Sequence, residues 1–363
     1  MPAKHQRSEN NPDVTTVALP GRSEHAITVS GRDCAALYRA VGAAAEARDA
    51  RVLTRFVFAN GDQKAFRRDV AGTDGCTVWL RGDTVRDGAT VAMQAFAISG
   101  TPLVPVRHGG RNVGFVYEDG QARYCRLSGV LPLDPGAPRD VQTRDVLETL
   151  AAALAAQGFE FTDTVRTWFY LDRLLEWYPA FNTVRTAFFA GHGVFEKRVP
   201  ASTGIGAGNP AGAALTVDLL AIRPTNGAIR IEAVPSPLQG SALNYRSSFS
   251  RAVEVVGPTH RFLTISGTAS IGPDGQTMCL GDCTGQIGRT LDVVQALLQS
   301  RGLDWADVTR GIAYFADLAD LPAFESACRA RGLPGLPLAL AQAAICRADL
   351  LFELEVDAAR CGE

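Results

Sequence analysis

The sequence predicts an α+β protein of ββαβαβ units, whose mixed sheets carry helices on one face and meet as a pseudo-trimer within one chain. Two observations predict this fold. One type of strand closes three successive segments, and the elements before it recur in the same order in the second and third segments. Internal repeats indicate stacked or pseudo-symmetric units. The first segment retains only the later part of the plan, so we expect a degenerate N-terminal unit.

The closing strand of the last segment carries the acidic residues on which the functional argument depends. Between residues 350 and 357, apolar residues alternate with Leu351, Glu353, Glu355 and Asp357. Alternation with a period of two is typical of a half-buried strand, so the three carboxylates are expected to share one face. Either of two interpretations explains them: the solvated face of an edge strand, or an acid or base that the strand holds rigidly.

The closing strands of the three segments carry different polar residues. By sequence alignment, Gln94, Asp218 and Glu353 take the same position. Only the last of them is a glutamate. If the three copies share a fold, we expect a single competent site, in the C-terminal unit.

Composition excludes several classes of protein. The chain has 363 residues and a net charge of −2, so no basic field attracts nucleic acid or an acidic membrane. No apolar run is long enough for a membrane span, and the first sixteen residues lack the apolar core of an export signal. The eight cysteines are therefore expected to be free thiols in a reducing cytoplasm. No histidine forms a zinc spacing with Cys279 and Cys283, so neither a metal nor a cofactor is expected.

The elements can be placed in order along the chain. The expected parts are a disordered tail, the degenerate unit, a middle unit and a C-terminal catalytic unit, at residues 1–20, 21–104, 105–224 and 225–363. The first unit has a helix over 33–48 and strands over 52–58, 76–80 and 89–98. The middle unit has a hairpin over 115–128, helices over 143–157 and 174–189, and strands at 165–171 and around 218. The last unit has a hairpin over 249–267, a helix around 287–298 that ends at Gly302, a strand at 308–315 and a helix at 321–331.

The second and third units share a specific register. LSGVLPLDPGAPRD matches ISGTASIGPDGQ, and FTDTVRTWFYLDRL matches WADVTRGIAYFADL. The SG after the second strand, the helix ending in glycine and the acidic closing strand resemble the RidA/YjgF family of small trimeric proteins. A three-unit chain with PASTGIG, SSFSRAVEV, ISGTAS and CRADLLFELE resembles the chorismatases more closely, which are RidA-like enzymes that release pyruvate from chorismate.

The resemblance implies roles for two residues. Glu353 stands where the family keeps its catalytic glutamate, and Cys346 stands where the hydroxybenzoate-forming branch has a cysteine. The residue type with which RidA proteins bind substrate, an arginine after the proline of PAR, is missing after both Pro200 and Pro337. Imine hydrolysis of the RidA type is therefore disfavoured in both units.

Chorismate has two carboxylates, a hydroxyl and an enolpyruvyl ether, and the candidate binding residues follow from these groups. Guanidinium groups bind carboxylates bidentately, which makes Arg251, Arg310 and Arg347 candidate clamps or, alternatively, surface arginines. Other candidates are backbone N–H groups of a glycine-rich segment, two hydroxyls and two small residues that line the site in RidA-like proteins. These are Thr203, Gly204 and Gly206; Tyr245 and Tyr314; and Gly267 and Ala269.

The predicted function is conversion of chorismate to 3-hydroxybenzoate and pyruvate in the cytoplasm, by a monomer or weak oligomer without nucleic-acid or membrane partners. Glu353 would protonate the enolpyruvyl group, with a pKa raised by burial or by its acidic neighbours. Alternatives are a chorismatase that forms 4-hydroxybenzoate or a dihydroxycyclohexadiene carboxylate, and a non-catalytic RidA-like binding protein. A buried Glu353 near arginines favours the enzyme, and a Glu353 on an open edge favours the binding protein.

Overall fold

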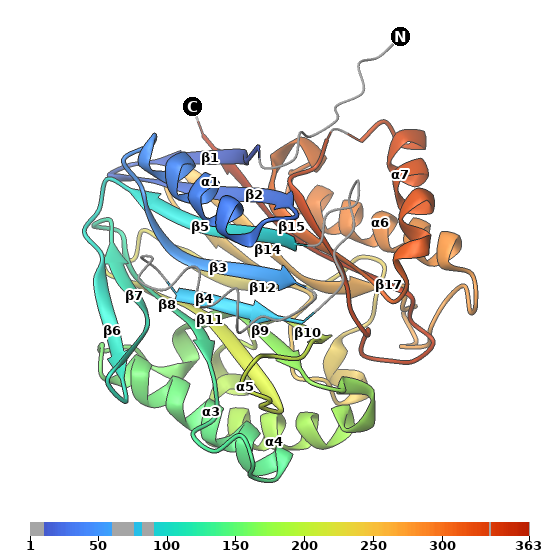
Figure 1. Cartoon of the computed structure of the whole chain (residues 1–363), viewed down its shortest axis with the longest axis horizontal. Helices are drawn as coiled ribbons and strands as arrows, with labels where there is room; N and C mark the ends of the chain where they lie inside the picture. The colour runs from blue at the N-terminus through green and yellow to red at the C-terminus, as the bar shows by residue number, and fades with distance from the viewer. Residues whose placement is uncertain (1–10, 60–75, 82–90, 334, 363) are drawn as a thin grey trace.

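The computed structural model describes residues 11–59, 76–81, 91–333 and 335–362, and contains three sheets. Each sheet is built from one continuous part of the chain. Figure 1 shows the three units around a common centre, with the N-terminal unit in blue, the middle unit in green and the C-terminal unit in orange and red. The predicted α+β pseudo-trimer is confirmed.

The N-terminal unit has five strands in the order β1-β2-β5-β3-β4. Helix α1 begins after Asp33, whose side chain accepts the Ala36 N–H. The tail predicted for residues 1–20 is wrong from Asp13 onward, because β1 pairs antiparallel with β2 along its whole length. This unit therefore has the opening hairpin that the sequence was expected to lack. The elements are β1 (Asp13–Leu19), β2 (Arg22–Gly31), α1 (Cys34–Glu46), β3 (Arg51–Ala59), β4 (Cys76–Leu80) and β5 (Val91–Ser99).

The middle and C-terminal units each have a six-stranded sheet. The strand order of the middle sheet, β6-β7-β8-β11-β9-β10, is the same as that of the C-terminal sheet, β12-β13-β14-β17-β15-β16. Each adds to the expected plan a strand before the hairpin and a short strand before the closing strand. The middle unit contains β6 (Val104–His108), β7 (Arg111–Glu118), β8 (Ala122–Val130), α3 (Arg139–Ala155), β9 (Thr164–Leu171), α4 (Tyr178–Gly191), α5 (Val194–Lys197), β10 (Ala201–Gly206) and β11 (Leu215–Pro224). The C-terminal unit contains β12 (Arg230–Val234), β13 (Ala252–Val256), β14 (His260–Ala269), α6 (Cys283–Gln299), β15 (Val308–Phe315), α7 (Leu321–Ala330), β16 (Leu338–Gln342) and β17 (Phe352–Cys361).

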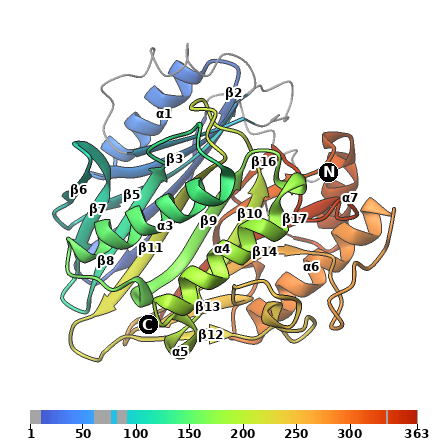
Figure 2. The same cartoon turned by 90° about the horizontal axis from the view of Figure 1, so that it is seen from below.

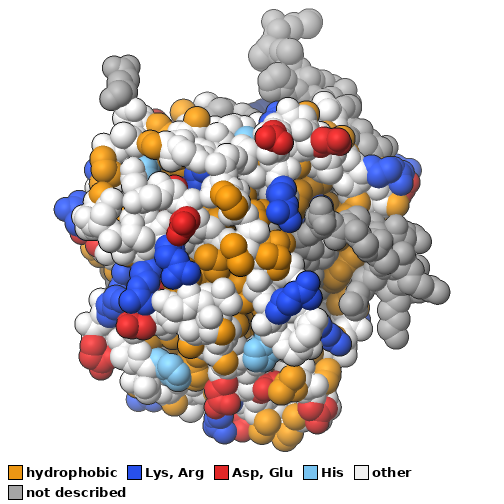
Figure 3. Space-filling model, turned by 90° about the vertical axis from the view of Figure 1, so that its left-hand side faces the viewer, with side chains coloured by type: hydrophobic (Ala, Val, Ile, Leu, Met, Phe, Trp, Pro, Cys, Tyr) orange, Lys and Arg blue, Asp and Glu red, His pale blue; other side chains and the backbone are white. Residues whose placement is uncertain are grey.

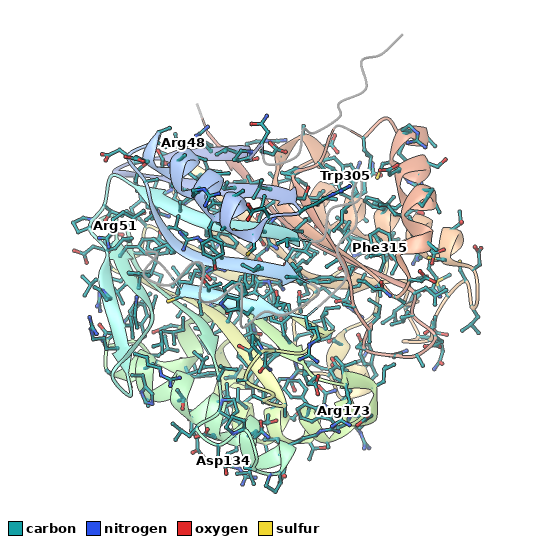
Figure 4. The ribbon with its side chains drawn as sticks, viewed as in Figure 1. Arg48, Arg51, Asp134, Arg173, Trp305 and Phe315 are labelled. Carbon is teal, nitrogen blue, oxygen red and sulfur yellow. The ribbon has the colours of Figure 1, made fainter. Side chains whose placement is uncertain are left out.

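Each sheet has a helix-covered face and an inner face. Helices α3 and α4 lie over the middle sheet in Figure 2, and α6 covers the C-terminal sheet. Trp305 and Phe315, labelled in Figure 4, belong to the apolar core between the C-terminal sheet and its helices. None of the described helices is long and apolar enough to cross a membrane. On the face shown in Figure 3, acidic and basic side chains are interspersed around a central group of hydrophobic ones.

The inner faces of the three sheets close into a ring. The edge strand of each unit contacts the hairpin of the next: β4 contacts β8, β10 contacts β14, and β16 contacts β2. A common apolar cluster fills the centre, with contributions from equivalent positions of the three units. It includes Phe56, Phe58, Trp168, Tyr170, Ile312 and Tyr314.

The SG dipeptides of the second and third units form β-bulges. Ser266 and Gly267 on β14 together oppose the single residue Glu355 on β17, and the same shift occurs between β8 and β11 opposite Asp218. The bulges and the pairing with β3, β9 and β15 therefore align Gln94 and Asp218 with Glu355. The alignment of these residues with Glu353 was wrong by two positions.

Candidate functional site

Glu353 lies where the middle unit meets the C-terminal unit. It occupies β17, between β14 and β15, opposite Ala269 on one side and Tyr314 on the other. The side chain is on the inner face of the sheet, and the residue is only 4% exposed. This geometry excludes the solvated face of an edge strand. The residues equivalent to Glu353 in the other two units are Ala92 and Thr216, which are not acids.

Gly267 gives the Glu353 carboxyl its room. A Cβ atom at position 267 would lie 1.9 Å from Oε1 of Glu353 and 3.3 Å from Cγ2 of Thr203. Any side chain at this position would have to displace the carboxyl, because real Cβ contacts are not that short. The predicted role of Gly267 in lining the site thus has a steric basis, and Ala269 completes this wall as the strand partner of Glu353.

We expect Gly267→Ala to slow any reaction that depends on the Glu353 carboxyl at least tenfold, because the added Cβ moves that carboxyl. The change should also cost about 1–3 kcal/mol of stability through overpacking. Gly42→Ala is the matched control, because a Cβ there meets nothing within 4 Å and the residue lies inside α1. That change should stabilise the protein by about 0.5–1 kcal/mol and leave activity unchanged. Steady-state kinetics and urea unfolding of both variants test this. Unchanged kinetics in Gly267→Ala would contradict it.

Burial controls the protonation of Glu353. Desolvation, followed by the negative charge of Glu355, raises the pKa of Glu353 to about 8, although Arg166 and Arg251 favour the charged form. The carboxyl is therefore mostly protonated at neutral pH. It is a group that can donate a proton.

Glu355, two residues on, is held by four donors and takes a different role. Arg166 Nη2 donates to its Oε2 over 2.9 Å and Trp168 Nε1 to its Oε1 over 3.0 Å. Thr203 Oγ1 and Arg310 Nη2 donate to the same carboxylate. With two arginines and all its acceptor positions engaged, this buried group is a structural anion and not a second candidate acid.

Arg310 belongs to this network and not to the group of residues around Glu353. Its Nε donates to Gln94 Oε1 over 2.7 Å and its Nη1 to Asp357 Oδ2 over 3.0 Å, besides the bond to Glu355. The prediction that Arg310 clamps a substrate carboxylate is therefore not supported, because its N–H groups are committed to protein acceptors. Tyr314 is likewise fully buried in the central apolar cluster, as aromatic residues in strands usually are.

The other two predicted clamps lie near Cys346. Arg251 donates through Nε and Nη2 to Gly240 O over 3.0 and 2.9 Å, and its guanidinium lies 5.6 Å from the Tyr245 ring centroid. Arg347 donates to Gly275 O over 2.7 Å and stacks 5.2 Å from the same ring. Both guanidinium groups thus lie close to the Tyr245 ring. Together they form the cationic side of the candidate site.

Cys346 interacts electrostatically with this group. Burial, with a further contribution from Glu353, raises the pKa of the thiol to about 12, while Arg347 and Arg251 favour the thiolate. The thiol is therefore neutral at physiological pH. It can exclude, contact or weakly hydrogen-bond a ligand, but it is a poor nucleophile.

The segment expected to bind an anion through its backbone is a strand. Residues 201–206 form β10, paired parallel with β9. The Gly206 N–H donates to Ala344 O over 2.8 Å, so Gly206 is not available to bind an anion through its backbone. Gly204 instead leaves space beside Tyr178, whose Oη would lie 3.3 Å from an added Cβ. Thr203 accepts the Gly267 N–H over 3.1 Å and the Arg166 Nη2 over 2.7 Å, which links the bulge to the Glu355 network.

Sequence reasoning missed two residues on α4 and one on β9. Burial and the neighbouring Cys346 raise the pKa of Tyr178 to about 12, and Glu353 also contributes, so the phenol lies near both. Arg185 is 1% exposed and donates to Asn182 Oδ1 over 2.6 Å and to Ser247 Oγ over 3.3 Å. Arg185 could have been found from the sequence, because an arginine on the apolar face of a helix indicates a buried charge with a specific partner. Arg166 could also have been found from the sequence, because it aligns with Arg310 in the repeat.

The described residues contain no group of three or more His, Cys, Asp or Glu side chains arranged to hold a metal ion. The site is instead a protonated carboxyl, a neutral thiol, two tyrosines and three arginines where two units meet. This set can bind an anionic organic molecule and donate a proton to it.

Comparison with known proteins supports the fold. No family model and no curated protein sequence matches the chain. The crystal structure of a chorismatase matches 85% of this chain and 93% of its own length, with a TM-score of 0.64 and 23% identity. A member of the YjgF/YER057c/UK114 family from Mycobacterium tuberculosis and the YjgF gene product from E. coli each cover 36% of the chain and 98% of their own. Their identities are 25% and 18%, and their TM-scores 0.29 and 0.30. The chain therefore has the fold of a chorismatase, as the sequence predicted.

Proposed function

We propose that this protein is a chorismatase that converts chorismate to 3-hydroxybenzoate and pyruvate. The observation that carries the proposal is Glu353, a buried carboxyl with a pKa raised to about 8 beside a cationic group of side chains. Protonation of an enol ether at its methylene carbon needs an acid of this kind at neutral pH. The similarity in fold to a chorismatase supports the choice of substrate.

The proposed reaction begins with transfer of the Glu353 proton to the methylene carbon of the enolpyruvyl group. The ether carbon becomes an oxocarbenium-like centre, and the carboxylate left on Glu353 stabilises it. Water adds to this carbon and returns a proton to Glu353, which gives a hemiketal. Collapse of the hemiketal breaks the bond between the ether oxygen and that carbon, moves the hydroxyl proton to the ring oxygen and releases pyruvate. Loss of the other ring hydroxyl and a ring hydrogen as water gives the aromatic product. Water taken up in the first stage is returned in the second, so the overall reaction consumes none.

The cationic residues would position the substrate. Arg251 and Arg347 both lie near the Tyr245 ring, and Arg185 lies across the interface on α4. We assign the two substrate carboxylates to these guanidinium groups, with Tyr178 and Tyr245 as hydroxyl donors. Placement by several charged groups would keep the methylene carbon near Glu353.

The test is to incubate the purified full chain with chorismate, quantify pyruvate, and identify the ring product by chromatography against standards of 3-hydroxybenzoate, 4-hydroxybenzoate and the dihydrodiol. We expect pyruvate and 3-hydroxybenzoate in equal amounts. Absence of pyruvate above the spontaneous background would reject the proposal and favour a binding protein. A different ring product would retain the enzyme class and reject the assigned product.

Cys346 is expected to control the product more than the rate. Cys346→Ala removes the neutral thiol without adding bulk, so pyruvate release should stay within about tenfold of the wild type. The share of 3-hydroxybenzoate should fall in favour of a non-aromatic diol, because ring dehydration would lose its steering group. Chromatography of the products at equal pyruvate release measures this share. An unchanged product ratio would show that Cys346 has only a packing role.

A further inference from the structure

A second space, separate from Glu353, lies where the three sheets meet. It is a cavity of about 120 Å³, and Glu353 is not among the residues that line it. A single water needs about 10–15 Å³ on this measure, so the space has room for on the order of ten non-hydrogen atoms. All three units contribute to its wall. Ala26 and Phe96 come from the first, Arg126 and Trp168 from the second, and Val253 and Phe262 from the third.

Three arginines lie close together in one part of this wall. The guanidinium carbons of Arg166 and Arg126 lie 4.7 and 4.8 Å from the Trp168 ring centroid, and that of Arg310 lies 5.9 Å from it. Arg126 also stacks 3.8 Å from the Phe96 ring. All five side chains line the cavity. Two aromatic rings thus lie against three arginines that line the cavity.

Two of these arginines have unused donors. Arg126 and Arg166 are 4% and 1% exposed. Nε and Nη2 of Arg126, and Nε and Nη1 of Arg166, have no hydrogen-bond partner among the described residues. Asp218 Oδ2, which also has no hydrogen-bond partner among the described residues, forms an ion pair with Arg126 Nη2 at 4.0 Å, a separation too long for a hydrogen bond.

The missing partner must be an acceptor, because a guanidinium group only donates. The carboxylates that line the cavity already have partners: Glu24 pairs with Arg22, and Asp357 pairs with Arg310. A planar anion with two oxygens matches the fork of an arginine. Polar side chains such as His25, Thr264 and Thr309 also line the cavity, but aliphatic and aromatic side chains make up much of the wall, so the rest of the ligand should be a flat apolar group. The apolar lining includes Leu53, Phe96, Ile98, Leu220, Ile222 and Val253.

We propose that this central cavity binds a small aromatic carboxylate. The carboxylate accepts hydrogen bonds from Arg126 and Arg166, and the ring lies against Phe96 and the aliphatic side chains of the three sheets. This site is distinct from the Glu353 site and does not depend on the reaction assigned to it. It uses all three units, including the N-terminal one.

The test is isothermal titration of the full-length protein with benzoate, with benzamide as a neutral control of the same shape. We expect binding of benzoate with a dissociation constant in the millimolar range or tighter, and much weaker binding of benzamide. Two variants probe the cavity independently. Arg126→Met removes the donors, and Ala26→Leu fills the space while keeping every charge. Each should weaken benzoate binding at least tenfold.

Arg251→Met separates this site from the Glu353 site, and it should leave benzoate binding at the cavity unchanged. Circular dichroism and thermal melting of each variant establish whether it is folded. If Arg126→Met does not fold, Ala26→Leu alone tests whether benzoate binds in the cavity. Two results would overturn the proposal. One is the absence of benzoate binding at about 10 mM ligand. The other is binding that survives Ala26→Leu but is lost in Arg251→Met.

Discussion

Glu353→Gln is expected to lower the rate of pyruvate release at least about 1,000-fold, because glutamine keeps the size of the side chain but has no acidic proton to give. In the wild type, the turnover number should fall as the pH rises through about 8, where burial places the pKa of Glu353. A coupled assay for pyruvate between pH 6 and 9 measures both effects. Retained activity in Glu353→Gln would reject Glu353 as the acid.

The same substitution should make the folded protein more stable at neutral pH. The pKa of Glu353 is raised in the folded state from 4.5 to about 8. Its protonated form therefore contributes stability that is fully present below the ordinary glutamate pKa and is lost as the pH rises toward about 8. In that window the unfolded chain binds fewer protons, so the wild type loses up to about 1.4 kcal/mol per pH unit from this group. Glutamine does not titrate, and the variant loses nothing.

Urea unfolding of both proteins at pH 5, 6.5 and 8 tests this linkage. The difference in free energy of unfolding should grow with pH in favour of Glu353→Gln. The exposed Glu148 of α3 supplies the control, since Glu148→Gln should shift the stability by less than about 0.5 kcal/mol at each pH. Parallel pH dependence of wild type and Glu353→Gln would show that Glu353 is ionised in the folded protein. A variant that is inactive but more stable would separate loss of chemistry from loss of structure.

Much of the fold could be predicted because the repeat is preserved where packing requires it. The helices, the hairpins and the closing strand keep their apolar periodicity in both larger units. In the N-terminal unit, strand β1 was missed because its residues are mostly only partly buried and its alternation of apolar and polar residues is weak. The strand β10 was not predicted, because the glycines of this segment hide the alternation, although they allow close contact with Ala344 and Tyr178.

The site could be predicted along the strand but not across the interface. Alternation placed Glu353, Glu355 and Asp357 on one face of the strand. Shifting the sequence alignment by two residues keeps every apolar residue on the opposite face, so the pattern alone did not determine which of these residues aligns with Gln94 and Asp218. The bulge at Ser266 and Gly267 decides it, and a bulge follows from pairing, which no single strand reveals. Tyr178 and Arg185 reach Cys346 from another unit, a contact that depends on how the three sheets close.

Glu355→Gln is expected to destabilise the protein by about 3–5 kcal/mol, in contrast to the neighbouring Glu353→Gln. Arg166, Arg310, Trp168 and Thr203 all donate to the Glu355 carboxylate, which is fully buried. A glutamine amide would direct N–H groups at these donors, remove the counter-ion of the buried Arg166, and leave Arg310 paired only with Asp357. Urea unfolding at pH 7 of the two variants, with Glu148→Gln as the common control, compares the two positions directly.

The opposite signs have one physical cause. Both glutamates are buried on the same face of β17, but only Glu355 has arginines within hydrogen-bond distance. A buried charge that is paired becomes costly when its partner is removed, whereas a buried acid that is already neutral loses little. Activity should fall in Glu355→Gln as well, because Thr203 and the Gly267 bulge depend on the same network. If Glu355→Gln lowers the free energy of unfolding by less than about 1 kcal/mol, water compensates for the missing charge, and the Glu355 carboxylate does not stabilise the packing of the three units.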